Sequence, residues 1–198
     1  MTWWDVALKS LVGGFIVSIG VASAQDDIIH NITEVRYDFE SNALQRAADL
    51  MLEASPIIES GEPKAADVNA DWKLSVSTEQ HEDGCRLTNV SVTLNTEMTL
   101  PNWADVEEMN AKIQAEWARY LAALRMHQDG HVEINLNTAQ EIKAALLAME
   151  PFETCEALKA AAGMTTATLQ AEAEDAHAAY DKKTKFGARQ GAILKRKR

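Results

Sequence analysis

Two stretches of alternating apolar residues, joined by a tight turn, constrain the fold of this chain most strongly. Trp72, Leu74 and Val76 alternate with polar residues, and residues 82–84 (Glu-Asp-Gly) supply a turn. Because successive side chains of a strand point to opposite faces, this pattern predicts a long β-hairpin with one buried face. The return strand continues the same phase at Val90, Val92, Leu94, Thr96, Met98 and Leu100.

The beginning of the return strand has the opposite phase. Cys85 and Leu87 do not share the parity of the apolar positions that follow them. One extra residue in a strand shifts the phase in this way, so we expect a β-bulge near Thr88 and Asn89.

The rest of the chain predicts one further strand and several helices. Residues 28–39 alternate loosely, and their candidate inward positions are Ile32, Val35, Tyr37 and Phe39. Apolar residues at helical spacing predict helices over about 41–54, 102–131, 138–149 and 154–179, with an irregularity around Gly163. The expected fold is α+β, with a small antiparallel sheet and a long hairpin packed on several helices.

The N-terminal segment is typical of an export signal. Residues 11–21 are apolar or small, and Ala22-Ser23-Ala24 fits a cleavage site before Gln25. We therefore predict a signal peptide over 1–24, one domain over 25–190 and a basic tail over 191–198. An uncleaved membrane anchor, lengthened by Trp3 and Trp4, is the alternative. Export predicts a periplasmic or secreted protein.

Charge is distributed unevenly along the chain. The net charge is −11, yet residues 182–198 hold eight of the 19 basic residues and no acid. The remaining body is strongly acidic, which argues against a nucleic-acid surface. Contact with a membrane is expected only through an uncleaved N-terminus or through the basic tail.

The chain has two cysteines, Cys85 and Cys155. An oxidising compartment favours a disulfide between them, which would close a loop of about 70 residues. Two separate buried thiols are the alternative.

The residues with the clearest chemical meaning are His127 to His131, which read H-Q-D-G-H. Two histidines four apart on a helix point the same way, so both can reach one metal ion. The motif of zinc metalloproteases is H-E-x-x-H, in which the glutamate is the general base. Gln128 stands in that position, and an amide cannot accept a proton. The alternative interpretation of His127 and His131 is a structural pair on a helix face that binds no metal.

Gly130, within the same motif, indicates close packing against another backbone.

Further stretches in the same order carry a family resemblance, which covers nearly all of the chain after the predicted signal peptide. They are Tyr37, the Trp72 strand, Cys85, residues 99–103 (Thr-Leu-Pro-Asn-Trp), Trp117, the two histidines, Cys155 and residues 180–187. The chain resembles the predicted secreted zinc-dependent proteases of bacteria, a domain-of-unknown-function family with the motifs H-E-x-G-H and Y-x-x-x-T-x-H-G. The resemblance implies a zincin-like fold with the motif on a central helix, and it implies zinc as the cofactor.

Two departures from the family pattern affect the chemistry. Gln128 replaces the general base, and Phe186 replaces the histidine of T-x-H-G, which the family pattern suggests as a further zinc ligand. Zinc binding is then expected to be weak or absent unless Asp129, His177 or a distant carboxylate contributes a ligand. Catalytic zinc usually has three protein ligands.

Three hypotheses about function follow. The first is an exported, zinc-protease-like protein that has lost most or all peptidase activity and binds a peptide or an envelope protein. The second is an active zinc peptidase in which Asp129 or Glu133 is the base, and His177 or an acid is the third ligand. The third is a structural envelope module whose histidines bind no metal.

Overall fold

The computed structural model describes residues 28–194, so the predicted signal peptide and residues 195–198 of the predicted basic tail lie outside the described residues. Within this range, no helix is long and apolar enough to cross a membrane. The elements in chain order are β1 (Ile28–Phe39), α1 (Leu44–Ala54), β2 (Ile58–Glu59), β3 (Glu62–Pro63), β4 (Asp67–His81), β5 (Gly84–Trp103), the 3-10 helix η1 (Val106–Glu108), α2 (Ala111–Leu147), α3 (Cys155–Thr184) and the 3-10 helix η2 (Ala188–Gln190).

The predicted hairpin is the centre of a three-stranded sheet with the order β1-β5-β4. β4 and β5 pair antiparallel, and the expected bulge is confirmed: Ser77 pairs with Asn89 and Thr78 with Leu87, which leaves Thr88 as the extra residue. β1 runs parallel to β5, so the sheet is mixed and the expectation of an antiparallel sheet was wrong. β2 and β3 form a separate small hairpin.

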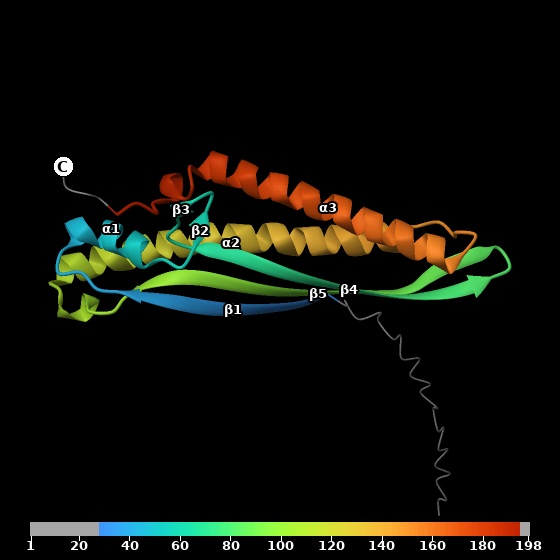
Figure 1. Cartoon of the computed structure of the whole chain (residues 1–198), viewed down its shortest axis with the longest axis horizontal. Helices are drawn as coiled ribbons and strands as arrows, with labels where there is room; N and C mark the ends of the chain where they lie inside the picture. The colour runs from blue at the N-terminus through green and yellow to red at the C-terminus, as the bar shows by residue number, and fades with distance from the viewer. Residues whose placement is uncertain (1–27, 195–198) are drawn as a thin grey trace, which may run out of the picture.

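Figure 1 shows α2 lying along the sheet and α3 returning antiparallel beside α2. The predicted start of the second helix near residue 102 was wrong, because Pro101 to Trp103 continue β5 beside β1. The helix begins after Asn110, whose side-chain oxygen accepts hydrogen bonds from the backbone N–H groups of Lys112 and Ile113. Such a cap satisfies donors that a helix start leaves without partners.

Both long helices are more continuous than the sequence pattern indicated. α2 runs through the predicted break between 131 and 138. Its residue Asn135, a poor helix former in isolation, is buried and hydrogen-bonded to His177. α3 passes Gly163 without interruption and extends to Thr184. A single glycine costs a helix about 1 kcal/mol, which tertiary packing offsets here.

β1 differs from the predicted pattern at two of its four inward positions. Phe39 is buried and Tyr37 half-buried, but Ile32 and Val35 are 55% and 39% exposed. β1 forms one edge of the sheet. An edge strand has a neighbour on one side only, so alternation along it does not guarantee burial.

The core consists of two apolar clusters, which contact different stretches of α2. One surrounds Trp103 and Trp117 near α1, and the other surrounds Val92 and Ile142 near the start of α3. Buried polar side chains of α2 lie mostly between the two clusters: His127, Gln128, Asn135 and Thr138. The fold therefore places a band of polar groups at the middle of a long helix.

The predicted disulfide between Cys85 and Cys155 is present, and it joins the start of β5 to the first residue of α3. Two backbone hydrogen bonds between Cys85 and Phe152, of 2.6 and 3.0 Å, fix the same junction. The bridge therefore ties the tip of the long hairpin to the helical layer.

Gly130 allows α3 to approach α2 closely. A Cβ at this position would lie 2.1 Å from the hydroxyl oxygen of Tyr180 and 2.3 Å from its Cζ atom. The close packing that Gly130 indicated is thus present, although it involves a side chain rather than a backbone. The ring of Tyr180 stacks on His127 at 5.1 Å and meets His131 edge-on at 5.0 Å.

We predict that replacing both cysteines with alanine lowers the free energy of unfolding by roughly 4 kcal/mol, because the bridge closes a long loop in the unfolded chain. Urea denaturation measured by circular dichroism tests this. Reduction of the native disulfide should produce a similar loss, and an unchanged midpoint after both treatments would contradict the prediction.

We predict that Gly130→Ala destabilises the protein by about 1–3 kcal/mol, because Tyr180 must move away from the added methyl group. Gly163→Ala is the matched control, since a Cβ there meets no atom within 4 Å. That substitution should stabilise α3 by up to about 1 kcal/mol. Equal effects of the two substitutions in thermal denaturation would contradict this account of Gly130.

Candidate metal centre

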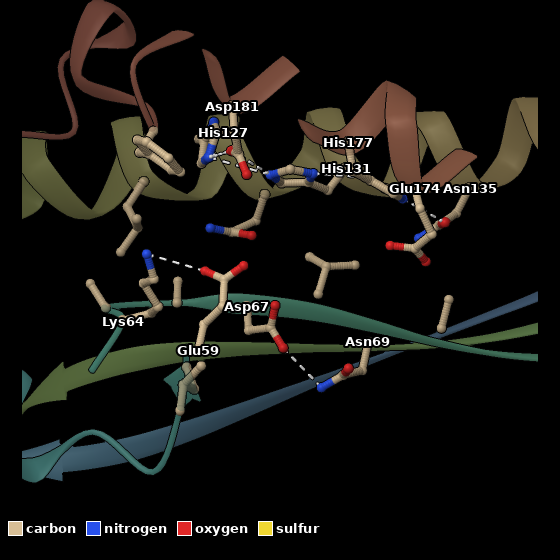
Figure 2. Close-up of a pocket in the computed structure, with 18 of the residues that line it drawn as sticks. Glu59, Lys64, Asp67, Asn69, His127, His131, Asn135, Glu174, His177 and Asp181 are labelled. Atoms are coloured by element: carbon tan, nitrogen blue, oxygen red, sulfur yellow. Dashed lines mark hydrogen bonds and ion pairs between the residues drawn. The ribbon is translucent and has the colours of Figure 1, made fainter. Parts of the chain in front are cut away.

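Three side chains converge on one point at the middle of the helix pair. His127 and His131 come from α2, and Asp181 comes from α3 (Figure 2). The Nε2 atoms of the two histidines are 3.3 Å apart. Oδ1 of Asp181 lies 3.1 Å from Nε2 of His127 and 3.2 Å from Nε2 of His131. The three atoms form a nearly equilateral triangle.

The size of this triangle fits a metal ion. Zinc binds imidazole nitrogen and carboxylate oxygen at about 2.0–2.1 Å in tetrahedral geometry, which separates neighbouring ligand atoms by about 3.3 Å. The observed separations therefore match three corners of a tetrahedron, and the fourth corner is left for another ligand. Asp181 is thus the third converging donor, in a chain where Phe186 stands in place of the family's histidine.

Hydrogen bonds on the far side of His131 determine which of its nitrogens carries the proton. The side-chain oxygen of Asn135 lies 3.0 Å from Nε2 of His177, so this nitrogen donates. A neutral His177 then has its lone pair on Nδ1, which lies 2.9 Å from Nδ1 of His131. Nδ1 of His131 must donate to it, which leaves the lone pair of His131 on Nε2, facing the triangle.

A second pair of hydrogen bonds does the same for His127. The amide nitrogen of Gln190 donates to the hydroxyl of Tyr180 at 2.9 Å, which turns the amide oxygen of Gln190 toward His127. Nδ1 of His127 lies 3.0 Å from this oxygen and donates to it. Nε2 of His127 is thereby left with its lone pair directed at Asp181. Supporting contacts of this kind orient the histidine ligands in metal sites.

Burial favours the neutral form of two of the histidines, His131 and His177. Burial, the largest effect, lowers the pKa of His131, while the carboxylate of Asp181 opposes that shift. Burial also lowers the pKa of His177, against the opposing charges of Glu174, Asp181 and Asp67. With the hydrogen bonds described above, the remaining nitrogens of the two imidazoles face the carboxylate of Asp181. A proton or a metal ion between these three atoms would stabilise the arrangement.

Gln128 is next to the triangle but contains no proton acceptor. It is 4% exposed and lies in the wall of a cavity that also contains His127 and His131. Asp129 and Glu133, the alternative bases, are exposed and do not line this cavity. The carboxylates that do line it, besides Asp181, are those of Glu59, Asp67 and Glu174.

Phe186, at the position of the family's histidine, also lines the cavity, but as an exposed ring. Lys185 and Phe186 both have left-handed backbone conformations, with φ of 53° and 51°. Such conformations are uncommon outside glycine. Gly187 follows, packed against His127, where an added Cβ would lie 3.1 Å from the ring's Cγ atom. Nζ of Lys64 lies 5.1 Å from the centre of the Phe186 ring.

The roles of His177 and Asp181 in the structure differ from those that the sequence pattern predicts. His177, considered as a replacement ligand, lies behind His131 and orients it, so it is not one of the three converging donors. Asp181 was not singled out, although it belongs to the closing signature and is the only acid between residues 176 and 198. The sequence does carry a signal for Asp181: it is a single acid beside a run of basic residues, four positions after His177 on the same predicted helix.

Comparison with known proteins supports the family resemblance in its coarser form. A family model described as bacterial protein of unknown function, DUF922, matches residues 35–187. No curated protein and no solved structure matches the chain. The matched segment contains every donor of the triangle, Gln128, both cysteines and the closing signature, and it spans well over half of the chain. The protein therefore belongs to the DUF922 family.

Proposed function

We propose that this protein is an exported, zincin-like protein that binds zinc through His127, His131 and Asp181, binds peptides beside the metal, and has lost most or all peptidase activity. The observation that carries the proposal is the combination of a complete set of donors with Gln128 in the position of the general base. Bound zinc would polarise a peptide carbonyl. The neighbouring amide can donate or accept a hydrogen bond but cannot remove a proton.

The surroundings of the triangle support a peptide as the bound molecule. The cavity has a volume of about 480 Å³ and extends along β4, where residues 67–70 line it. β4 forms an edge of the sheet in the described part of the chain. An extended peptide can hydrogen-bond to such an edge as an added strand. The disulfide is compatible with an oxidising compartment, in agreement with export.

An active zinc peptidase is the alternative, and one observation favours it. Glu59, on the small β2–β3 hairpin, directs its carboxylate into the cavity from the side opposite the histidines (Figure 2). In this version Asp181 is the third ligand and Glu59 takes the role that Gln128 cannot fill. Glu59→Gln would then abolish turnover.

We predict that the metal-free protein binds one zinc ion and that Asp181→Asn weakens binding by more than the roughly 10–100-fold typical of supporting residues. Isothermal titration calorimetry measures this. Asp175→Asn, on an exposed part of α3, is the matched control and should bind like the wild type. Zinc should also raise the melting temperature, since it binds only the folded state. Identical melting curves with and without zinc would instead indicate a structural module.

We predict that Gln128→Glu raises the rate of peptide hydrolysis by about 10²–10⁴-fold over the wild type, because it restores a general base beside the donors. A mixture of fluorogenic peptides, assayed with zinc-loaded protein, provides the measurement. Glu133→Gln, on the exposed side of the same helix, is the control. Substantial wild-type turnover that is unchanged by Gln128→Glu and lost in Glu59→Gln would establish the alternative.

A further inference from the structure

The wall of the cavity contains a polar side chain that has no hydrogen-bond partner among the described residues and whose amide faces the cavity. No residue in the described part of the chain forms a hydrogen bond with the side chain of Gln128, although this residue is 4% exposed and lines the cavity. No fully buried side-chain nitrogen or oxygen in the described part of the chain lacks a partner, so the amide atoms of Gln128 reach the open space of the cavity. The amide of Gln128 is therefore available to a ligand that enters the cavity.

The cavity also has an excess of negative charge that a metal ion at the triangle would not remove. Apart from Asp181, three carboxylates line it: Glu59 from β2, Asp67 from β4 and Glu174 from α3. Figure 2 shows Glu59 and Asp67 on the strand side of the cavity and Glu174 on the α3 side. The three carboxylates thus come from separate elements and face a common space.

The positive charge in the cavity wall is smaller. Among the described residues that line the cavity, Lys64 is the one lysine or arginine. Its Nζ atom lies 3.1 Å from a carboxylate oxygen of Glu59. The side chain of Asp67 accepts a hydrogen bond from the neutral amide of Asn69 at 2.9 Å. Two carboxylates, Asp67 and Glu174, are therefore left without a cation in the wall.

Apolar surface borders these charges. Ile58 and Phe186 line the cavity and are 62% and 64% exposed. Lysine and arginine side chains combine an apolar stem with a charged end, and they cover apolar surface while the charge stays in a polar environment. The ring of Phe186 already holds one ammonium group near its face, that of Lys64.

We propose that the cavity selects peptides that carry a lysine or arginine side chain. The basic group pairs with Asp67 and Glu174, its stem lies against Ile58 and Phe186, and the Gln128 amide hydrogen-bonds to the peptide backbone. This inference rests on the proposed function, because it assigns the charge of the peptide that binds beside the metal centre.

The test is a binding comparison with the full, zinc-loaded protein. The probes are fluorescein-labelled decamers of alanine and threonine with one central residue, which is lysine, norleucine or glutamate. Fluorescence anisotropy should give a dissociation constant roughly tenfold lower for the lysine peptide than for the norleucine peptide, with glutamate weakest. The preference should decrease as salt is raised, because exposed charges are screened.

Variants locate the source of the preference. Asp67→Asn and Glu174→Gln should each reduce the lysine preference by roughly two- to fivefold, the range for partly exposed ion pairs. Glu62→Gln and Glu172→Gln are the matched controls, since these acids are exposed on the same hairpin as Glu59 and on the same helix as Glu174 but do not line the cavity. Gln128→Leu should weaken all three peptides equally, because the amide contacts the backbone.

Equal affinities for the three peptides would overturn the inference, and so would a lysine preference that the control variants reduce as much as the cavity variants do. Binding of none of the peptides would overturn it as well. Zinc calorimetry on the same samples separates this result from failure of the proposed function. If the protein binds zinc but does not select the lysine peptide, only this inference is wrong. If it binds neither zinc nor peptide, the proposed function is wrong too.

Discussion

The close approach of α3 to α2 at Gly130 is the contact on which the candidate site depends. The Tyr180 ring lies where any other residue at 130 would place its Cβ, and it touches both histidines. Asp181 is the next residue along α3, so the position of the aromatic ring also sets that of the carboxylate. A shift of α3 by the width of a methyl group would separate the donors that come from different helices. A motif on one helix is in this way completed by a residue 50 positions later.

The buried polar side chains around this contact would destabilise the fold if they were not hydrogen-bonded. Buried polar groups cost free energy unless they are paired, and partly satisfied networks are worse than apolar packing. Here Asn135, His177 and His131 form one chain of hydrogen bonds, and Tyr180, Gln190 and His127 form another. Both chains end at nitrogen lone pairs that face Asp181. The network thus brings its remaining nitrogen and oxygen atoms together at a single point, while the apolar clusters on either side stabilise the fold.

Local patterns in the sequence predicted the parts of the structure that depend on local rules. Alternation identified the hairpin and its bulge, and the two cysteines indicated their bridge. The start of α2 was misplaced because Asn102 and Asn110 are both credible caps, and only pairing with β1 keeps residues 101–103 in the strand. The alternation of β1 failed at Ile32 and Val35 because burial depends on the neighbours that the strand acquires. The position of Asp181 could not be predicted for the same reason: helix spacing places His127 beside His131, but only tertiary packing places α3 against them.

The two covalent or coordinate links available to α3 occupy opposite ends of the helix. The disulfide holds its first residue, Cys155, to the tip of the long hairpin. A zinc ion at the triangle would hold Asp181, near the last turn, to the middle of α2. Without an ion, the last turns of α3 would be held to α2 by noncovalent contacts alone, chiefly those of Tyr180 with Gly130 and the two histidines. The two ends of α3 would therefore differ in kind, because one is fixed by a covalent bond and the other would gain a link only when a metal ion is bound.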